Sequence, residues 1–222
     1  MAEALRIAIV GAESTGKTAL ARALAGRLAE LTGRRCTWVG EWLRHWCERE
    51  GRTPRPNEQA AIAEHQHRLI DAAAAEHDLV VCDTTALMTA VYSGMLFDDH
   101  SLETFAIEQQ RRCALTLLTA LDIAWVADGL QRDGPQVRAP VDDRVRALLI
   151  GHQIPWSLVS GQGNARVEAA VDAVAPLLRQ HGIGGSGLFS RLSERDAAPA
   201  GRAWLCGDCD DADCEHQSRQ PR

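Results

Sequence analysis

Lysine is nearly absent from this sequence. The chain has 24 lysine and arginine residues, and all of them are arginine except Lys17. Either residue can carry a surface charge, but where a site needs a compact ammonium group, the planar guanidinium group of arginine replaces it poorly. The single lysine therefore marks a position at which we expect the chemistry to require an ammonium group.

Positive net charge and long apolar runs are also missing. The formal net charge is −6, which argues against a nucleic-acid backbone as the principal partner, because such binders concentrate positive charge. No apolar run approaches the roughly 20 residues of a membrane span, and an apolar strand that begins at Arg6 leaves no room for a signal peptide. We expect a cytoplasmic protein that binds neither nucleic acid nor membranes, and the sequence carries no signal for its oligomeric state.

Four of the seven cysteines are scattered through apolar or helical stretches. Reduced thiols of this kind behave as small apolar side chains and are commonly buried. We expect the following to be free thiols in the core: Cys36, Cys47, Cys82 and Cys113.

Residues 11–18 (GAESTGKT) match the pattern G-x-x-x-x-G-K-[ST] of a phosphate-binding loop. An apolar run precedes the loop at residues 6–10 and a helical pattern follows it at residues 19–24, as the mechanism requires because phosphates bind at a helix N-terminus. Gly11 and Gly16 permit backbone angles and a close approach that a Cβ atom would block. The stretch therefore predicts a site for a nucleoside triphosphate.

The side chains of this loop have distinct expected roles. Lys17 places a cation on the β- and γ-phosphates, and the Thr18 hydroxyl can bind Mg²⁺. ATP and Mg²⁺ are the expected cofactors, and no N-K-x-D motif is present to favour guanine. We assign ATP binding to Gly11, Glu13, Ser14, Thr15, Gly16, Lys17 and Thr18.

The rest of the chain alternates strands with helices. Further strands are predicted at residues 36–40, 79–83, 122–129 and 155–159, and helices at residues 17–31, 57–77, 84–95, 101–119, 141–150 and 167–178. This alternation after a phosphate-binding loop predicts an α/β fold, a doubly wound parallel sheet of five strands with right-handed crossovers. The strand order 2-3-1-4-5 is expected by analogy with P-loop kinases.

Two carboxylates follow predicted strands at their carboxyl ends, where α/β sheets place their chemistry. Glu41 is a candidate site carboxylate, and a solvated residue in the first turn of a helix is the alternative. Asp83 ends the third strand, where P-loop proteins have an acidic residue that holds Mg²⁺ through water or takes a proton from the acceptor hydroxyl. Thr84 follows it instead of a second carboxylate, which favours a kinase over a motor-type ATPase.

A polar stretch at residues 130–138, punctuated by Gly and Pro, is a candidate lid. Its arginines, Arg132 and Arg138, are expected to neutralise charge on the transferred group while closure excludes water. A plain surface loop is the alternative.

Several polar and aromatic residues on the predicted helices have competing interpretations. Residues 65–67 (His-Gln-His) do not suggest a metal site, because rings two positions apart on a helix point in different directions. Gln66 is a candidate substrate contact, with a solvent-facing glutamine as the equal alternative. Tyr92, Phe97 and Phe105 are expected to pack rather than to stack on a cofactor.

The composition changes after the last predicted helix. Residues 1–181 form the predicted kinase domain, residues 182–203 predict a flexible linker, and residues 204–222 are a Cys/His-rich tail. A short tail cannot fold on a core of its own, and its Cys-x2-Cys spacing offers two thiolates to one metal, so we predict a structural Zn²⁺. The predicted ligands are Cys206, Cys209, Cys214 and His216. A disordered acidic tail with idle or redox-active cysteines is the alternative.

Five segments, in the same order, resemble the NadR-type nicotinamide riboside kinase domain. They are residues 11–18 with Glu13 at the third place, Glu41-x-x-Arg44, Ala63-Glu64-His65-Gln66, Cys82-Asp83-Thr84, and Trp125-Val126-Ala127-Asp128-Gly129-Leu130. The last segment is the discriminating one, because many families share the phosphate-binding loop. One departure is that Gln131 precedes Arg132, where the family often has Arg directly after Asp-Gly-Leu.

The resemblance implies transfer of the γ-phosphoryl group of ATP to the 5′-hydroxyl of nicotinamide riboside, a nucleoside-like acceptor of NAD salvage. The DNA-binding and adenylyltransferase activities of bifunctional members are not carried over. Substrate binding is assigned to Glu41, Arg44, Gln66 and Asp128. Catalysis is assigned to Lys17, Asp83, Arg132 and Arg138.

Two other functions stay open at this stage. One is a P-loop regulatory ATPase or nucleotide-dependent binding module, whose tail recruits a partner and whose slow hydrolysis ignores any riboside. The other is a kinase for a different nucleoside, because the side chains that select the acceptor converge from several loops.

Overall fold

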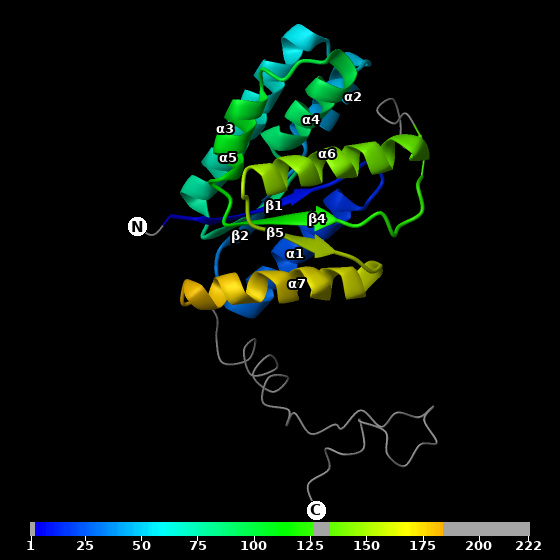
Figure 1. The fold of residues 1–222 in the computed structure, drawn as a ribbon. Helices are drawn as coiled ribbons and strands as arrows, with labels where there is room; N and C mark the ends of the chain where they lie inside the picture. The colour runs from blue at the N-terminus through cyan, green and yellow to red at the C-terminus, as the bar shows by residue number, and fades with distance from the viewer. Residues whose placement is uncertain (1–2, 127–133, 184–222) are drawn as a thin grey trace, which may run out of the picture. The chain divides into compact units, whose positions relative to one another are not determined.

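A five-stranded β-sheet, parallel throughout, organises the fold (Figure 1). Its strands are β1 (Leu5–Val10), β2 (Cys36–Val39), β3 (Leu79–Asp83), β4 (Leu115–Thr119) and β5 (Trp156–Val159). They lie in the order β2-β3-β1-β4-β5. The predicted fold class and strand order are confirmed.

The structure is a computed structural model that describes residues 3–126 and 134–183. These residues belong to one compact unit, Met1–Ile183. The predicted tail and residues 184–203 of the predicted linker lie outside the described residues. In the part of the chain that is described, no helix combines the length and apolar character needed to cross a lipid bilayer.

The two central strands are mostly apolar, as expected for strands covered on both faces. All six residues of β1 and all five of β3 are buried. The strands pair with Leu5 opposite Leu79 and Ile9 opposite Asp83. This register places Asp83 next to the end of β1, where the glycine loop begins.

Helices cover both faces of the sheet (Figure 1). They are α1 (Lys17–Thr32), α2 (Trp42–Glu50), α3 (Gln59–Glu76), α4 (Ala86–Phe97), α5 (Glu103–Gln110), α6 (Arg138–Gly151) and α7 (Gly163–Gln180), with 3₁₀ turns η1 (Pro56–Glu58) and η3 (Pro135–Val137). In Figure 1, α1 and α7 lie together on one face, and α3, α4, α5 and α6 lie on the other. The helix α2 packs against α3.

The fourth strand lies earlier in the chain than the sequence predicts. Residues 101–119 are not one helix, because α5 ends at Gln110 and β4 follows it. The last four residues of β4 are buried, and the strand pairs with β1 and β5. Residues 122–126 form no strand, and Val126 is 62% exposed. The predicted helix at residues 101–119 and the predicted strand at residues 122–129 are therefore wrong. An apolar composition at residues 123–126 resembles a strand, but it does not show that the fourth strand of the sheet has already ended before them.

The cysteine prediction is confirmed for three of the four residues. Cys47, Cys82 and Cys113 are buried free thiols. Cys36 is also a free thiol but is only half-buried, because β2 is an edge strand of the sheet.

A buried polar network connects α4, α5 and β4. The Thr85 hydroxyl donates to Gln110 Oε1 over 2.6 Å, and Gln110 Nε2 donates to the Thr116 hydroxyl over 2.7 Å. Thr85 also caps α4 by accepting from the Leu87 N–H. Both ends of the Gln110 amide are thus hydrogen-bonded, as buried polar groups normally are.

Candidate functional site

The loop of residues 11–18 connects β1 to α1 at the carboxyl end of the sheet. Gly11 and Gly16 have φ angles of 143° and 76°, a region that disfavours residues with a Cβ atom. Gly16 directly precedes Lys17, the first residue of α1, so the loop leads into the N-terminus of a helix, where backbone N–H groups are free to bind an anion. The predicted succession of strand, loop and helix is confirmed.

The end of β4 braces this loop. The Thr119 hydroxyl oxygen lies 2.7 Å from the Thr15 hydroxyl and 3.2 Å from the Val10 carbonyl oxygen. The Thr15 hydroxyl donates to the Ala12 carbonyl over 2.8 Å. A Cβ atom on Gly11 would lie 2.2 Å from Thr119 Oγ1, so a side chain there would displace the brace. Sequence reasoning missed Thr119 because it placed this residue in a helix.

A buried arginine of α7 hydrogen-bonds to the glycine loop and to the loops that follow β4 and β5. Arg166 is 3% exposed and donates to the Thr15 carbonyl over 3.0 Å and to the Ala120 carbonyl over 3.2 Å. It also donates to Asp122 over 2.7 Å and to the Gly161 carbonyl over 2.8 Å. Burial opposes the charge on Asp122, but hydrogen bonds from Arg166 and the Gly161 N–H outweigh it and lower the pKa of Asp122. No local sequence signal marks Arg166, because its partners are distant in the chain.

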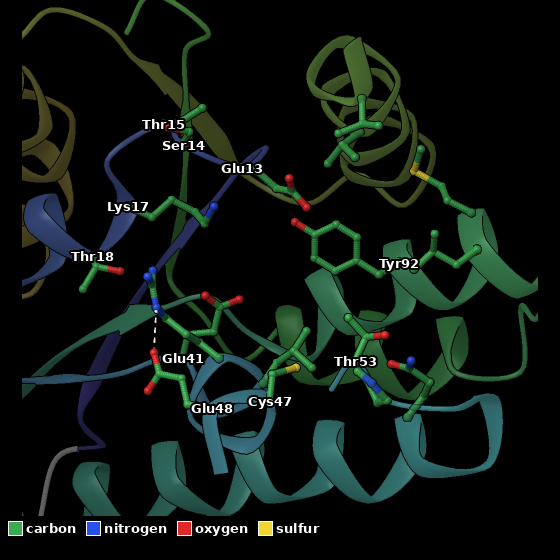
Figure 2. Close-up of a pocket in the computed structure, with 18 of the residues that line it drawn as sticks. Glu13, Ser14, Thr15, Lys17, Thr18, Glu41, Cys47, Glu48, Thr53 and Tyr92 are labelled. Carbon is green, nitrogen blue, oxygen red and sulfur yellow. Dashed lines mark hydrogen bonds and ion pairs between the residues drawn. The ribbon is translucent and has the colours of Figure 1, made fainter. Parts of the chain in front are cut away.

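Lys17 and its neighbours line a common cavity. Lys17 Nζ donates to the Ala12 carbonyl over 2.8 Å, which holds the ammonium group across the loop. Figure 2 shows the Lys17 amine directed into the cavity. The predicted ATP-binding residues that line the cavity are Glu13, Ser14, Thr15, Gly16, Lys17 and Thr18.

Asp83 is 1% exposed, and neither of its carboxylate oxygens has a hydrogen-bond partner within the described residues. Burial raises the pKa of Asp83, and the Thr18 hydroxyl and the charges of Lys17, Arg44 and Arg22 partly offset this effect. A buried, unpartnered carboxylate is costly unless something neutralises it. Carboxylate and hydroxyl oxygens are ligands that Mg²⁺ accepts, so Asp83 and Thr18 fit the predicted Mg²⁺.

The residue after Asp83 has a strained backbone. Thr84 is buried and has a φ angle of 67°, which is rare for a β-branched residue. Its N–H donates to the Ile9 carbonyl over 3.0 Å. Such strain persists where the surrounding structure imposes it, and here it fixes the turn that follows the carboxylate.

A cavity of about 860 Å³ opens beside the loop (Figure 2). The loop forms one wall, and α2 supplies a second, polar wall with Glu41, Arg44 and Glu48. Arg44 Nε lies 3.3 Å from Glu48 Oε1. Glu41 is the N-cap residue of α2, close to the first-turn position that the alternative interpretation gave it. It also lines the cavity, as expected for a site carboxylate. The structure thus brings Glu41 and Arg44 into the same cavity as Lys17.

The third wall is largely apolar and comes from α4 and the start of α6. Its residues are Tyr92, Met95, Leu96, Phe97, Val137 and Val141. Tyr92 packs against the core as predicted but also faces the cavity, where Figure 2 shows its hydroxyl directed toward Glu13. Phe97 likewise lines the cavity, whereas Phe105 packs against a buried cluster. Helical periodicity could not separate these positions, because a cavity wall and a core contact have the same spacing.

Gln66 does not line the cavity. Its Oε1 accepts from the Trp42 N–H over 2.6 Å, and its Nε2 donates to the Gly40 carbonyl over 3.2 Å. The side chain is buried, so the alternative of a solvent-facing glutamine is wrong. Both ends of its amide bond to the backbone on either side of Glu41, so the described structure places Gln66 behind the cavity wall and not at the position of a direct substrate contact.

The candidate lid is only partly described. Arg138 is buried at the start of α6, and its Nε and Nη2 atoms have no hydrogen-bond partner in the described part of the chain. Its neighbours Val137 and Val141 line the cavity, whereas Arg138 does not. Arg132 and Asp128 lie outside the described residues, so their roles stay predictions.

The predicted zinc site also lies outside the described residues. Its ligands are Cys206, Cys209, Cys214 and His216. Across residues 3–126 and 134–183, no group of three or more His, Cys, Asp or Glu side chains is placed to hold a metal ion. The structural zinc site stays a prediction that elemental analysis of the purified protein can test.

The geometry defines the class of protein. A buried strand, a glycine loop with one lysine, a helix N-terminus and a buried carboxylate on the adjacent strand are the parts of a P-loop nucleotide-binding protein. A family model described as an AAA domain matches residues 6–166, so the chain belongs to this family of AAA domains.

Three solved structures resemble this fold. A crystal structure of NadR protein in complex with NR has a TM-score of 0.61 and 20% identity, covering 77% of this chain and 50% of that one. NadR protein in complex with NAD and AMP-PNP has a TM-score of 0.59 and 18% identity, covering 77% of this chain and 48% of that one. A crystal structure of thymidylate kinase from Ehrlichia chaffeensis has a TM-score of 0.54 and 16% identity, covering 79% of this chain and 100% of that one.

These likenesses show that the chain has the fold of the P-loop kinases. The resemblance to the NadR-type domain is thereby confirmed at the level of the fold. The chain spans about half the length of the two NadR proteins. A comparison with curated protein sequences finds no match.

We expect Arg166→Met to weaken Mg-ATP binding roughly 10-fold or more, because the loop carbonyl of Thr15 loses its donor and Asp122 loses its partner. Isothermal titration calorimetry measures the affinity. Arg179→Met, on an exposed turn of the same helix, is the matched control and should bind Mg-ATP like the wild type. Equal affinities for both variants at a temperature where both are folded would contradict the bracing role of Arg166.

Asp83→Asn should stabilise the nucleotide-free protein at about pH 8. Because burial raises the pKa of Asp83, the native state binds this proton more tightly than the unfolded chain does. The resulting stability is present below the unfolded pKa of about 3.9 and is lost as the pH rises through the raised pKa. Thermal melting should therefore show a higher Tm for Asp83→Asn at about pH 8 and a difference that shrinks toward about pH 4. A lower Tm for the variant at about pH 8 would contradict this account.

Proposed function

We propose that this protein is a Mg²⁺-dependent kinase that transfers the γ-phosphoryl group of ATP to the 5′-hydroxyl of nicotinamide riboside. The observation that carries the proposal is a single cavity that extends from the phosphate-binding loop, past Glu41 and Arg44, to the apolar wall of α4. Its volume of about 860 Å³ lies in the range of small-molecule sites. A phosphate site and an acceptor site can therefore share this cavity.

The loop and its lysine would bind the triphosphate. Lys17 and the backbone N–H groups at the start of α1 supply positive potential for the β- and γ-phosphates. Thr18 and Asp83 would hold Mg²⁺, which neutralises charge on the phosphates when it is bound. Arg132 is proposed to add positive charge over the transferred group, and the charge of Arg138, which is buried and does not line the cavity, would act from a greater distance.

Glu41 is better placed than Asp83 to meet the acceptor hydroxyl. Glu41 lines the cavity, whereas Asp83 does not. As the acceptor oxygen bonds to the γ-phosphorus, the bond from that phosphorus to the β–γ bridging oxygen breaks, and Glu41 would take the hydroxyl proton. Gln66 supports this role, because it hydrogen-bonds to the backbone of the residues on either side of Glu41.

Two features support a charged nucleoside as the acceptor rather than water. Thr84 follows Asp83 where an ATPase would have a second carboxylate to activate water. Glu13, Glu41 and Glu48 all line the cavity, which suits the positively charged ring of nicotinamide riboside better than a neutral base. One NadR structure with this fold holds NR and another holds NAD and AMP-PNP, which supports the proposal of a nicotinamide nucleoside and ATP as ligands.

The test is ADP release against a panel of nucleosides that includes nicotinamide riboside and thymidine, with and without Mg²⁺. We expect release to require both Mg²⁺ and nicotinamide riboside. Glu41→Gln should lower kcat by about 10²-fold to 10⁴-fold with little change in Mg-ATP affinity, because it removes a proton acceptor. Lys17→Ala should abolish turnover while leaving the circular dichroism spectrum unchanged.

The outcomes separate the alternatives. ADP release at the same rate with and without any nucleoside would contradict a kinase and support a regulatory ATPase. Release with thymidine but not with nicotinamide riboside would assign the protein to another nucleoside. An unchanged kcat in Glu41→Gln would remove Glu41 from the reaction.

A further inference from the structure

Gln59, the first residue of α3, is a buried residue of the cavity lining whose amide has an unused hydrogen-bonding atom. The residue is 2% exposed and lines the cavity. Its Oε1 atom is buried and has no hydrogen-bond partner among the described residues. Among the described residues, the two other buried glutamines are Gln66 and Gln110, and each has both ends of its amide hydrogen-bonded. Gln59 is therefore the exception.

The backbone next to Gln59 is held firmly, which fixes the point from which its side chain projects. The preceding residue, Glu58, receives two hydrogen bonds of 2.7 Å from Arg52 and one of 2.7 Å from the Arg55 N–H. The Arg52 guanidinium also lies 4.9 Å from the centre of the Trp46 ring. These contacts close the segment between α2 and α3 and fix the position at which α3 begins.

No described residue is hydrogen-bonded to Gln59 Oε1. The lining of the cavity includes the polar side chain of Thr53 as well as Leu43, Cys47 and Pro54, whose side chains are poor hydrogen-bonding partners for an amide. A buried polar group left unsatisfied costs about 1 to 3 kcal/mol. A polar residue retained in such a place is explained if a ligand supplies the missing bond.

We propose that Gln59 recognises the base of the phosphoryl acceptor through its amide group. Whichever way the amide is turned, one of its atoms accepts and the other donates. Its complement is a ligand with an N–H donor beside a carbonyl acceptor, that is, a primary carboxamide or the amide edge of a nucleobase. A carboxylate offers no donor and should be rejected.

This inference rests on the proposed function, since it places the acceptor in the cavity that contains Lys17. Figure 2 shows Thr53, from the segment that leads into α3, on the side of the cavity away from Thr18. The arrangement sets the reacting hydroxyl near the loop and the base near α3. Gln59 is then a specificity-determining residue, distant from the transferred phosphoryl group.

The experiment compares nicotinamide riboside with nicotinic acid riboside, which has a carboxylate in place of the carboxamide. Wild type and Gln59→Met are assayed for kcat and KM with each riboside. Methionine keeps the length of the side chain and removes both hydrogen-bonding atoms. Gln180→Met, at an exposed position of α7, is the matched control.

We expect wild type to prefer the amide, and Gln59→Met to raise the KM for nicotinamide riboside by about 10-fold to 100-fold, the effect of one buried hydrogen bond. The KM for ATP should not change, and the preference for the amide over the acid should shrink by the same factor. The Tm of Gln59→Met should equal or exceed that of wild type, because an unsatisfied buried group has been removed. If Gln59 had only a structural role, its substitution by methionine would lower the Tm.

The outcomes distinguish this inference from the proposed function. If Gln59→Met leaves the KM for nicotinamide riboside unchanged, the inference is wrong and the kinase stands. A lowered Tm with equal losses for both ribosides also overturns it. If wild type phosphorylates a different nucleoside, the proposed acceptor is wrong, and the KM for that nucleoside in Gln59→Met then decides the inference. If no nucleoside is phosphorylated, both fail.

Discussion

The phosphate-binding loop keeps its shape because Thr15 is held from two directions. Its hydroxyl lies against Thr119 at the end of β4, and its carbonyl accepts a hydrogen bond from Arg166 of α7. Both partners are buried, so these bonds operate away from competing water. A loop held in this way presents its N–H groups without reorganisation when a phosphate arrives, which is the condition for strong electrostatic stabilisation. The rest of the site is arranged around this fixed loop.

The cavity joins two surfaces of opposite character. The loop and α2 bring charged groups, whereas α4 and the start of α6 bring an apolar wall. The loop with Lys17 suits a triphosphate, the carboxylates of α2 suit a cationic acceptor, and the apolar wall suits its planar base. Two glutamines of α3 have different surroundings: Gln66 hydrogen-bonds to the backbone on both sides of Glu41, and Gln59 belongs to the cavity lining. The helices α2, α3, α4 and α6 thus supply most of the cavity wall beyond the loop.

The sequence predicts those parts of the site that depend on residues close together in the chain. The loop of residues 11–18 and the carboxylate Asp83 are each encoded by a short stretch next to a buried strand. Long-range contacts were not predictable in this way. Arg166 meets its partners only after the chain has crossed the sheet, and β4 was misplaced because an apolar run elsewhere mimics a strand. Gln59 and Gln66 lie on one helix, and only the packing of α2 decides which one faces the cavity.

Lys17 carries the one lysine ammonium group of the chain, which permits a direct measurement of the central claim. An amine-acylating reagent is applied with and without Mg-ATP, and mass spectrometry quantifies modification at Lys17 against the N-terminal amine. If the loop and its lysine bind the triphosphate, Mg-ATP should protect Lys17 from acylation and leave acylation of the N-terminal amine unchanged. Equal acylation of Lys17 in the presence and absence of saturating Mg-ATP would contradict the account.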